Sequence, residues 1–104
     1  MAWDDIRYFL ALARGGSLSA AARVLQVEHS TVARRVEHLE ARLGVRLFDR
    51  LARGWALTGE GAALRERAEA VELEVLALER AAAGVESLAG VVTVSAPPVL
   101  LSRL

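Results

Sequence analysis

The sequence predicts an all-α fold with a small β-hairpin wing, followed by one long helix, and three observations predict it. Apolar residues recur at helical spacing in three short segments before residue 45. Two short apolar-containing runs over residues 46–57 then indicate a hairpin. From residue 59 onward, apolar residues alternate at spacings of four and three, which is typical of a long helix with a heptad seam.

The first predicted helix is scaffold. Asp4 is expected to cap it, and Gly15-Gly16 is expected to end it. Its inward stripe is predicted from the helical spacing of Ile6, Phe9, Leu10 and Ala13.

The second and third predicted helices are separated by a three-residue turn. Ser17 is expected to cap a helix over residues 18–25, and Gln26-Val27-Glu28 forms the turn. Gly44 supplies a left-handed C-terminal cap for the next helix. The buried face of that helix is predicted to consist of Val32, Val36, Leu39 and Leu43. This arrangement is typical of a helix-turn-helix, whose second helix enters the major groove by its N-terminal residues.

Donors and cations occupy the outward face of the third helix, with no carboxylate between Glu28 and Glu37. Such a face suits an acidic, hydrogen-bonding partner. The alternative is an ordinary solvated helix face, with the hydroxyl side chains serving only as helix caps. The residues concerned are His29, Ser30, Thr31, Arg34 and Arg35.

The hairpin that follows is interpreted as a wing. Its strands are expected within residues 46–50 and 54–57, separated by Leu51-Ala52-Arg53. Arg50 and Arg53 are expected to reach phosphates, which would position the domain without reading sequence.

Charge is unevenly distributed along this 104-residue chain of zero formal net charge. Residues 1–58 hold nine Arg against six acidic residues, whereas residues 59–104 hold four Arg against seven Glu. The basic half is therefore the half that carries the helix-turn-helix pattern. The absence of cysteine excludes a disulfide framework and a cysteine nucleophile, and it fits a reducing cytosol. No apolar run is long enough to predict a membrane segment.

The long helix is expected to run from Gly59 to about Ser87, after Thr58. An uncovered apolar seam predicts a homodimer, with the two helices antiparallel so that their Arg-rich and Glu-rich ends meet. The alternative is that the first helix of the same chain covers the seam. A strand is expected over residues 90–96, and a further helix from Pro97. The predicted dimerisation residues are Leu64, Ala68, Val71, Val75, Leu78, Ala82 and Val85.

Residues 16–25, residues 39–50 and Leu57-Thr58, taken together in order, resemble the DNA-binding domain of LysR-type transcriptional regulators. The resemblance implies a winged helix-turn-helix over 1–58, a dimerisation linker helix over 59–88 and the incomplete start of an effector-binding domain over 89–104. It also implies a cytoplasmic dimer on double-stranded DNA with an interrupted palindrome. A small-molecule co-inducer is expected only in a full-length protein.

The chain departs from the family at the start of the predicted recognition helix. Glu28-His29-Ser30 stands where the family usually has Ser-Gln-Pro, and Ala33 replaces a usual Ser. The family's base contacts are therefore not transferred to these four positions. The predicted DNA contacts are Ser17, Ser19, His29, Ser30, Thr31, Arg34, Arg35, Arg50 and Arg53.

An enzyme is not expected, because no nucleophile, phosphate-binding loop or metal-ligand spacing is recognisable. No cofactor is predicted either. The rival hypothesis is a winged-helix module used only for dimerisation or protein binding, with its Arg-rich side facing an acidic protein.

Overall fold

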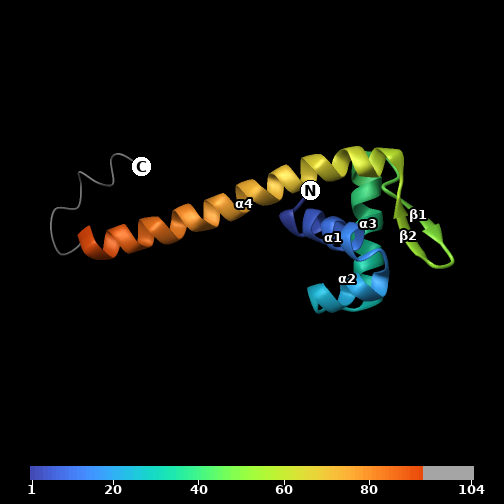
Figure 1. Ribbon diagram of the computed structural model, residues 1–104, viewed down its shortest axis with the longest axis horizontal. Helices are drawn as coiled ribbons and strands as arrows, with labels where there is room; N and C mark the ends of the chain where they lie inside the picture. The colour runs from blue at the N-terminus through green and yellow to red at the C-terminus, as the bar shows by residue number, and fades with distance from the viewer. Residues whose placement is uncertain (93–104) are drawn as a thin grey trace. The chain divides into compact units, whose positions relative to one another are not determined.

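The computed structural model describes the backbone of residues 1–92 and the side chains of residues 1–85 (Figure 1). Contacts within the chain define two compact units, Met1–Ala70 and Val71–Leu104. The predicted class, helical with one antiparallel hairpin and a long final helix, is confirmed. The elements are α1 Trp3–Gly15, α2 Leu18–Leu25, α3 His29–Leu43, β1 Phe48–Leu51, β2 Gly54–Leu57 and α4 Gly59–Val92.

Helix α1 begins earlier than predicted, because Ala2 rather than Asp4 occupies the cap position. Asp5, in the first turn, reaches back so that its Oδ2 accepts a hydrogen bond from the Ala2 N–H at 3.2 Å. Asp4 instead pairs with Arg7 at 2.8 Å. The left-handed Gly16, with φ of 78°, ends the helix.

Helix α2 and its turn follow the sequence prediction. The Ser17 hydroxyl accepts a hydrogen bond from the Ala20 N–H at 3.1 Å, as an N-cap serine should. Gln26 adopts the left-handed conformation with φ of 59°, and Val27 donates its N–H to the Ala22 carbonyl at 3.1 Å. Val27 then packs against the core, which ties the turn between α2 and α3 to the helices.

Helix α3 buries Val32, Val36 and Leu39, as predicted from their spacing. The prediction for Leu43 is wrong, because this side chain is 39% exposed. Leu43 is the last residue of the helix, and the chain turns away at Gly44, whose φ is 73°. The core therefore ends before the final turn of α3.

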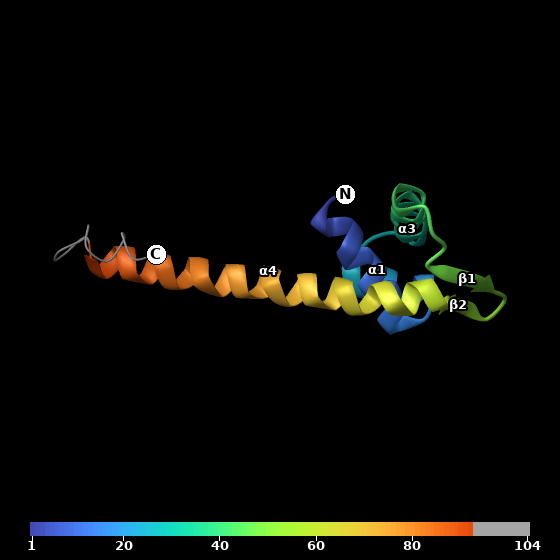
Figure 2. The ribbon, with the colours of Figure 1, turned by 90° about the horizontal axis from the view of Figure 1, so that it is seen from above.

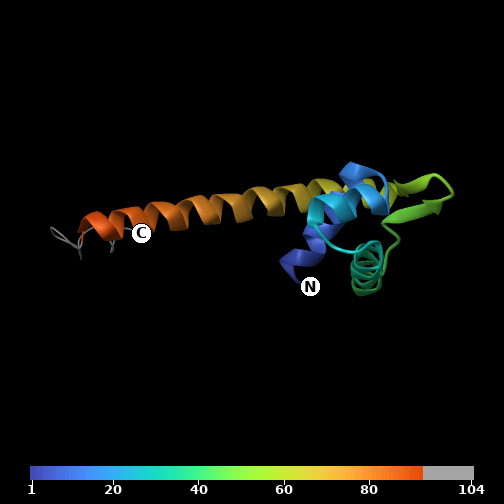
Figure 3. The ribbon, with the colours of Figure 1, turned by 90° about the horizontal axis from the view of Figure 1, so that it is seen from below.

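The hairpin is confirmed, although β1 begins at Phe48 rather than among Arg46 and Leu47. Phe48 pairs with Leu57, and Leu51 pairs with Gly54 across a two-residue turn. In Figures 2 and 3 the turn of the hairpin lies away from α1, α2 and α3. The side chain of Phe48 is fully buried, so the base of the hairpin belongs to the core while its turn is exposed.

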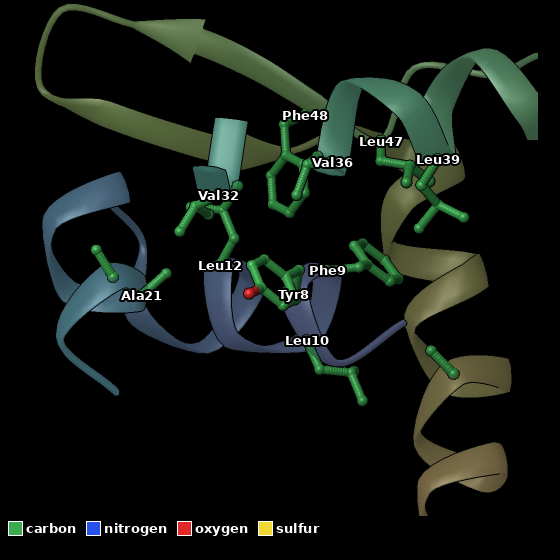
Figure 4. Packing of buried hydrophobic residues seen from close by; sticks show 12 residues of the cluster. Tyr8, Phe9, Leu10, Leu12, Ala21, Val32, Val36, Leu39, Leu47 and Phe48 are labelled. Carbon is green, nitrogen blue, oxygen red and sulfur yellow. The ribbon is translucent and has the colours of Figure 1, made fainter. Parts of the chain in front are cut away.

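The core of the first unit joins α1, α2, α3, the hairpin base and the first turns of α4. Figure 4 shows Val36 of α3 and Phe48 of β1 close together over the side chains of α1. The rings of Phe9 and Phe48 meet edge to face, with centroids 5.6 Å apart. The most deeply buried large side chains are Phe48, Leu10, Leu12, Leu39, Leu47, Val32 and Val36.

The start of α4 is anchored to the segment before β1. The Thr58 N–H donates to the Leu47 carbonyl at 3.0 Å, and the Thr58 hydroxyl donates to the Arg46 carbonyl at 2.6 Å. The same hydroxyl oxygen accepts from the Gly61 N–H at 2.9 Å, which caps the helix. The backbone of residues 46–47 and the first turn of α4 therefore lie almost in contact at Gly61.

Two residues of the predicted dimerisation seam belong to the core of the first unit instead. Ala68 is 8% exposed, and Leu64 packs against the same core cluster. Their own chain buries Ala68 and half-buries Leu64, because the first turns of α4 pack against the core. The seam residues beyond Ala70 lie in the second unit, where Val71 is 41% and Leu78 is 69% exposed.

Helix α4 extends to Val92, so the strand predicted to start at Gly90 is wrong for its first three residues. A helix satisfies its backbone hydrogen bonds within itself, whereas a lone strand leaves them unpaired. The remainder of that predicted strand and the helix predicted from Pro97 fall in residues 93–104, outside the described residues.

Candidate nucleic-acid interface

The outward face of α3 presents an unpaired arginine next to the N-terminal turn. His29, Ser30 and Arg34 are exposed. By helical spacing Ser30 and Arg34 lie on the side opposite the buried Val32 and Val36, whereas His29, the first residue of the helix, lies on the same side as these two valines. Within the described part of the chain, Arg34 makes no hydrogen bond or ion pair. Its guanidinium is therefore free for an external acceptor.

The cap of α3 leaves the same end of the helix open. Glu28 occupies the cap position, but its side chain makes no capping hydrogen bond. The first N–H groups with intrahelical partners are those of Thr31 and Val32, which both bond to the Glu28 carbonyl. A helix end of this kind suits phosphate oxygens and other hydrogen-bond acceptors.

Arg35, predicted to contact DNA, is held by α1. Its Nη1 lies 3.2 Å from Oδ1 of Asp5, and its guanidinium carbon lies 5.4 Å from the centre of the Tyr8 ring. The Asp5 side chain is 7% exposed, whereas that of Arg35 is 38% exposed. Arg35 thus neutralises a buried carboxylate and lies over the Tyr8 ring, and about a third of its side chain remains exposed to solvent.

An open hollow lies between α1 and α3 beside this pair. It is lined by Asp5, Arg34, Arg35 and His38. His38, which also lines the hollow, is exposed. The hollow therefore joins the free Arg34 and the paired Arg35 on one continuous surface.

Arg50, predicted to contact phosphate, is held on the opposite side of α3. It pairs with Glu40 at 2.9 Å and Glu37 at 3.5 Å, and its guanidinium carbon lies 4.3 Å from the centre of the Trp55 ring. The Arg50 side chain retains 34% exposure. Most of its bonding capacity is thus used within the protein.

Arg53, in the turn of the hairpin, is exposed and has no ion pair within the described residues. Of the two serines predicted to contact DNA, Ser17 is half-buried and caps α2, while Ser19 is exposed. Thr31 is half-buried at the first turn of α3. Arg34 and Arg53 are therefore the two predicted cations that the described structure leaves available.

Two carboxylates that the sequence did not single out interact with α3 or belong to it: Asp5 is buried and Glu40 is half-buried. Burial of Asp5 raises its pKa, but the Ala2 N–H and the Arg35 guanidinium lower it more, so the net pKa falls below its ordinary value. Burial likewise raises the pKa of Glu40, and hydrogen bonds from Arg50 and two backbone N–H groups reverse this to a net lowering. No local pattern marks Glu40, because its partners lie seven to ten residues further along the chain, whereas Asp5 combines a local bond from Ala2 with the distant Arg35.

These lowered pKa values predict a loss of stability in acid. Each ionised carboxylate stabilises the folded state fully above its unfolded pKa, and the contribution is lost as the pH falls through the lower folded pKa. The free energy of unfolding should therefore decrease below roughly pH 5. Urea unfolding between pH 7 and pH 3 measures this. The Glu40→Gln variant should show a shallower decrease, and an equal decrease in both proteins would contradict the assignment.

Within residues 1–92 no helix combines the length and apolar character needed to cross a membrane. Among the side chains described, no three His, Asp or Glu residues come together as metal ligands would.

Comparison with known proteins matches residues 3–62 to the family described as "Bacterial regulatory helix-turn-helix protein, lysR family". The HTH-type transcriptional regulator TfdS of Cupriavidus pinatubonensis is 47% identical over 68 residues, which is 65% of this chain and 23% of the relative. CrgA of Neisseria meningitidis serogroup B, also an HTH-type transcriptional regulator, is 37% identical over 103 residues, 97% of this chain and 34% of that protein. The chain thus spans about a quarter to a third of the curated relatives that it matches.

Solved structures agree with the fold. The CbnR DNA-binding domain in complex with DNA superposes with a TM-score of 0.73 at 37% identity, covering 82% of this chain and 99% of that one. The BenM DNA-binding domain bound to catB site 1 DNA gives a TM-score of 0.79 at 26% identity, with coverage of 84% and 98%. The family match covers the helix-turn-helix, the wing and the start of α4, the elements that build the exposed face described above. The chain therefore belongs to the lysR family of bacterial regulatory helix-turn-helix proteins.

Proposed function

We propose that this chain is a sequence-specific DNA-binding module that inserts the N-terminal turns of α3 into the major groove. The observation that carries the proposal is the exposed Arg34, unpaired within the described chain, beside the open N-terminus of α3. Arg is the side chain best suited to bidentate contact with guanine in the major groove. The similar CbnR and BenM domains have been solved in complexes with DNA, which supports the same use of this fold.

The side chains divide into reading and positioning groups. His29, Ser30 and Arg34 are proposed to face base edges, because they are exposed on the first two turns of α3. Thr31, Ser19, Arg53 and the cap residue Ser17 are proposed to contact phosphates, together with the free N–H groups of α3. Arg35 and Arg50 use their charges within the protein, so their proposed contacts with DNA are limited to the exposed parts of their guanidinium groups.

Regulation is proposed to require two copies. Leu64 and Ala68 pack against the core of their own chain. The other residues of the predicted seam are Val71, Val75, Leu78, Ala82 and Val85. We propose that they pair with the same residues of a second, antiparallel α4. The two copies of α3 would then bind the two halves of an interrupted palindrome. A co-inducer would act through a part of the regulator beyond the residues described. The proposed location is the cytoplasm.

A gel-shift titration tests the DNA-binding proposal. The purified protein is titrated against pooled genomic fragments at several salt concentrations. DNA binding predicts a complex whose affinity falls linearly with the logarithm of salt concentration. The rival protein-interaction module predicts no such complex.

Replacement of the two available arginines should have different consequences. Arg34→Ala is expected to reduce specific binding more than random binding, by roughly 1–3 kcal/mol of discrimination, because a base contact is lost. Arg53→Ala should weaken both about equally and flatten the salt slope by about one unit. The ratio of specific to random affinity at fixed salt measures the difference. An unchanged ratio for Arg34→Ala would show that Arg34 does not read bases.

A further inference from the structure

Glu40 joins the recognition helix α3 to the wing through both of its carboxylate oxygens. Its Oε2 accepts hydrogen bonds from the N–H groups of Leu47 at 2.8 Å and Phe48 at 3.2 Å. Its Oε1 accepts from Nη2 of Arg50 at 2.9 Å. The side chain is 12% exposed, so solvent screens these bonds only weakly. One carboxylate therefore holds the start of β1 and its third residue to α3.

Arg50 extends this connection to the second strand of the wing. Its guanidinium lies against the Trp55 ring while one of its nitrogen atoms pairs with Glu40. The backbone of Trp55 is in turn anchored to the end of α1, because its backbone N–H donates to the carbonyl of the cap residue Gly16 at 3.1 Å.

The wing needs such an attachment because two short strands alone are marginally stable. Each strand has four residues, and the exposed Arg53 lies in the turn between them. The location of Arg53 relative to Arg34 therefore depends on how firmly the hairpin base is held to α3.

From this geometry we infer that Glu40 is a positioning residue, which sets the placement of the wing so that Arg53 reaches the phosphate backbone while α3 reads the groove. The inference rests on the proposed DNA binding and assigns a specific role to a residue that does not itself touch DNA. Contact energy at Arg53 can be realised only if the wing is already in place when α3 docks.

A double-mutant cycle between Glu40→Gln and Arg53→Ala tests the inference. A glutamine has one oxygen and one NH₂ group, so it cannot accept from the two backbone N–H groups and from Arg50 as the carboxylate does. In the native background, Arg53→Ala should weaken binding to a specific fragment about fivefold at fixed low salt. In the Glu40→Gln background, the same replacement should cost less than about twofold, because the wing is no longer held in place.

This coupling separates positioning from simple stabilisation. Loss of stability lowers the fraction of folded protein equally with and without Arg53, so it leaves the cost of Arg53→Ala unchanged. Glu37→Gln is the matched control, because Glu37 also pairs with Arg50 but forms no described bond to the backbone of the wing. In that background Arg53→Ala should still cost about fivefold.

Each outcome has a distinct meaning. Absence of any salt-dependent complex with the native protein would overturn the proposed function itself. A complex that forms, with an equal cost of Arg53→Ala in the native and Glu40→Gln backgrounds, would overturn only the role of Glu40. If circular dichroism shows Glu40→Gln to be unfolded, Arg50→Lys replaces it in the cycle. Lysine keeps the charge but loses the planar guanidinium on Trp55, so a reduced cost of Arg53→Ala is expected and an unchanged cost would overturn the inference.

Discussion

The Gly61→Ala variant is expected to lose roughly 3 kcal/mol or more of folding stability. A Cβ atom at residue 61 would lie 2.1 Å from the carbonyl oxygen of Leu47 and 3.0 Å from its carbonyl carbon. The nearest obstructing atom is a backbone oxygen, and the Leu47 carbonyl is also the acceptor for the Thr58 N–H. Relief of the clash would therefore move α4 away from the hairpin and disturb the core around Leu47.

Chemical denaturation of the two proteins measures this loss. Gly59→Ala provides a matched control two residues earlier in the same helix, where an added Cβ would meet no atom within 4 Å. It should be neutral or slightly stabilising, because alanine favours helix more than glycine does. Equal stability of the Gly61→Ala variant and the native protein would show that α4 does not approach Leu47 as closely as described.

The Leu78→Asp variant is expected to be folded but monomeric, and to lose about 100-fold or more in affinity for an operator with two half-sites. Leu78 is 69% exposed in the second unit, and its replacement places a charge in the middle of the proposed seam. Burial of an unpaired carboxylate in an apolar dimer contact is strongly unfavourable. A single half-site, which needs only one copy, should lose much less affinity.

Leu73→Asp is the control for this experiment. Leu73 is 64% exposed and lies on the opposite side of α4 from the seam, by its helical spacing from Leu78. The same chemical change should there leave the dimer intact. Sedimentation gives the oligomeric state and gel shifts give the two affinities. A monomeric native protein at high micromolar concentration, with the wing intact, would refute the dimer proposal.

Predictions from the sequence succeeded where short-range chemistry determines the structure. The Ser17 cap, the left-handed Gly44 and the buried spacing of Val32, Val36 and Leu39 each depend on residues within a few positions of one another. The hairpin likewise follows from two short runs and a turn. These local rules establish the order and type of the elements in the first unit, and they place Arg34 on the outward face of α3.

Where these rules failed, a competing local choice existed. Asp4 and Asp5 can each stabilise a helix start. In the structure Ala2 occupies the cap position, and the Asp5 carboxylate accepts a hydrogen bond from its N–H. The pattern of Gly90 to Val92 is compatible with a strand, but a strand needs a partner and a helix does not. Periodicity alone does not distinguish the two in a short apolar run.

By itself, the sequence determined which faces of α1, α2 and α3 are apolar and where these helices end. Only the tertiary structure decided which of the charged side chains form ion pairs within the protein. Asp5 and Arg35 are thirty residues apart, and Glu40 and Arg50 belong to different elements, so no short pattern shows that they meet. The tertiary structure also decided that Ala68 of the predicted seam is covered by its own chain. The physical reason is that caps and periodicity act within a few residues, whereas ion pairing and burial depend on segments that only folding brings together.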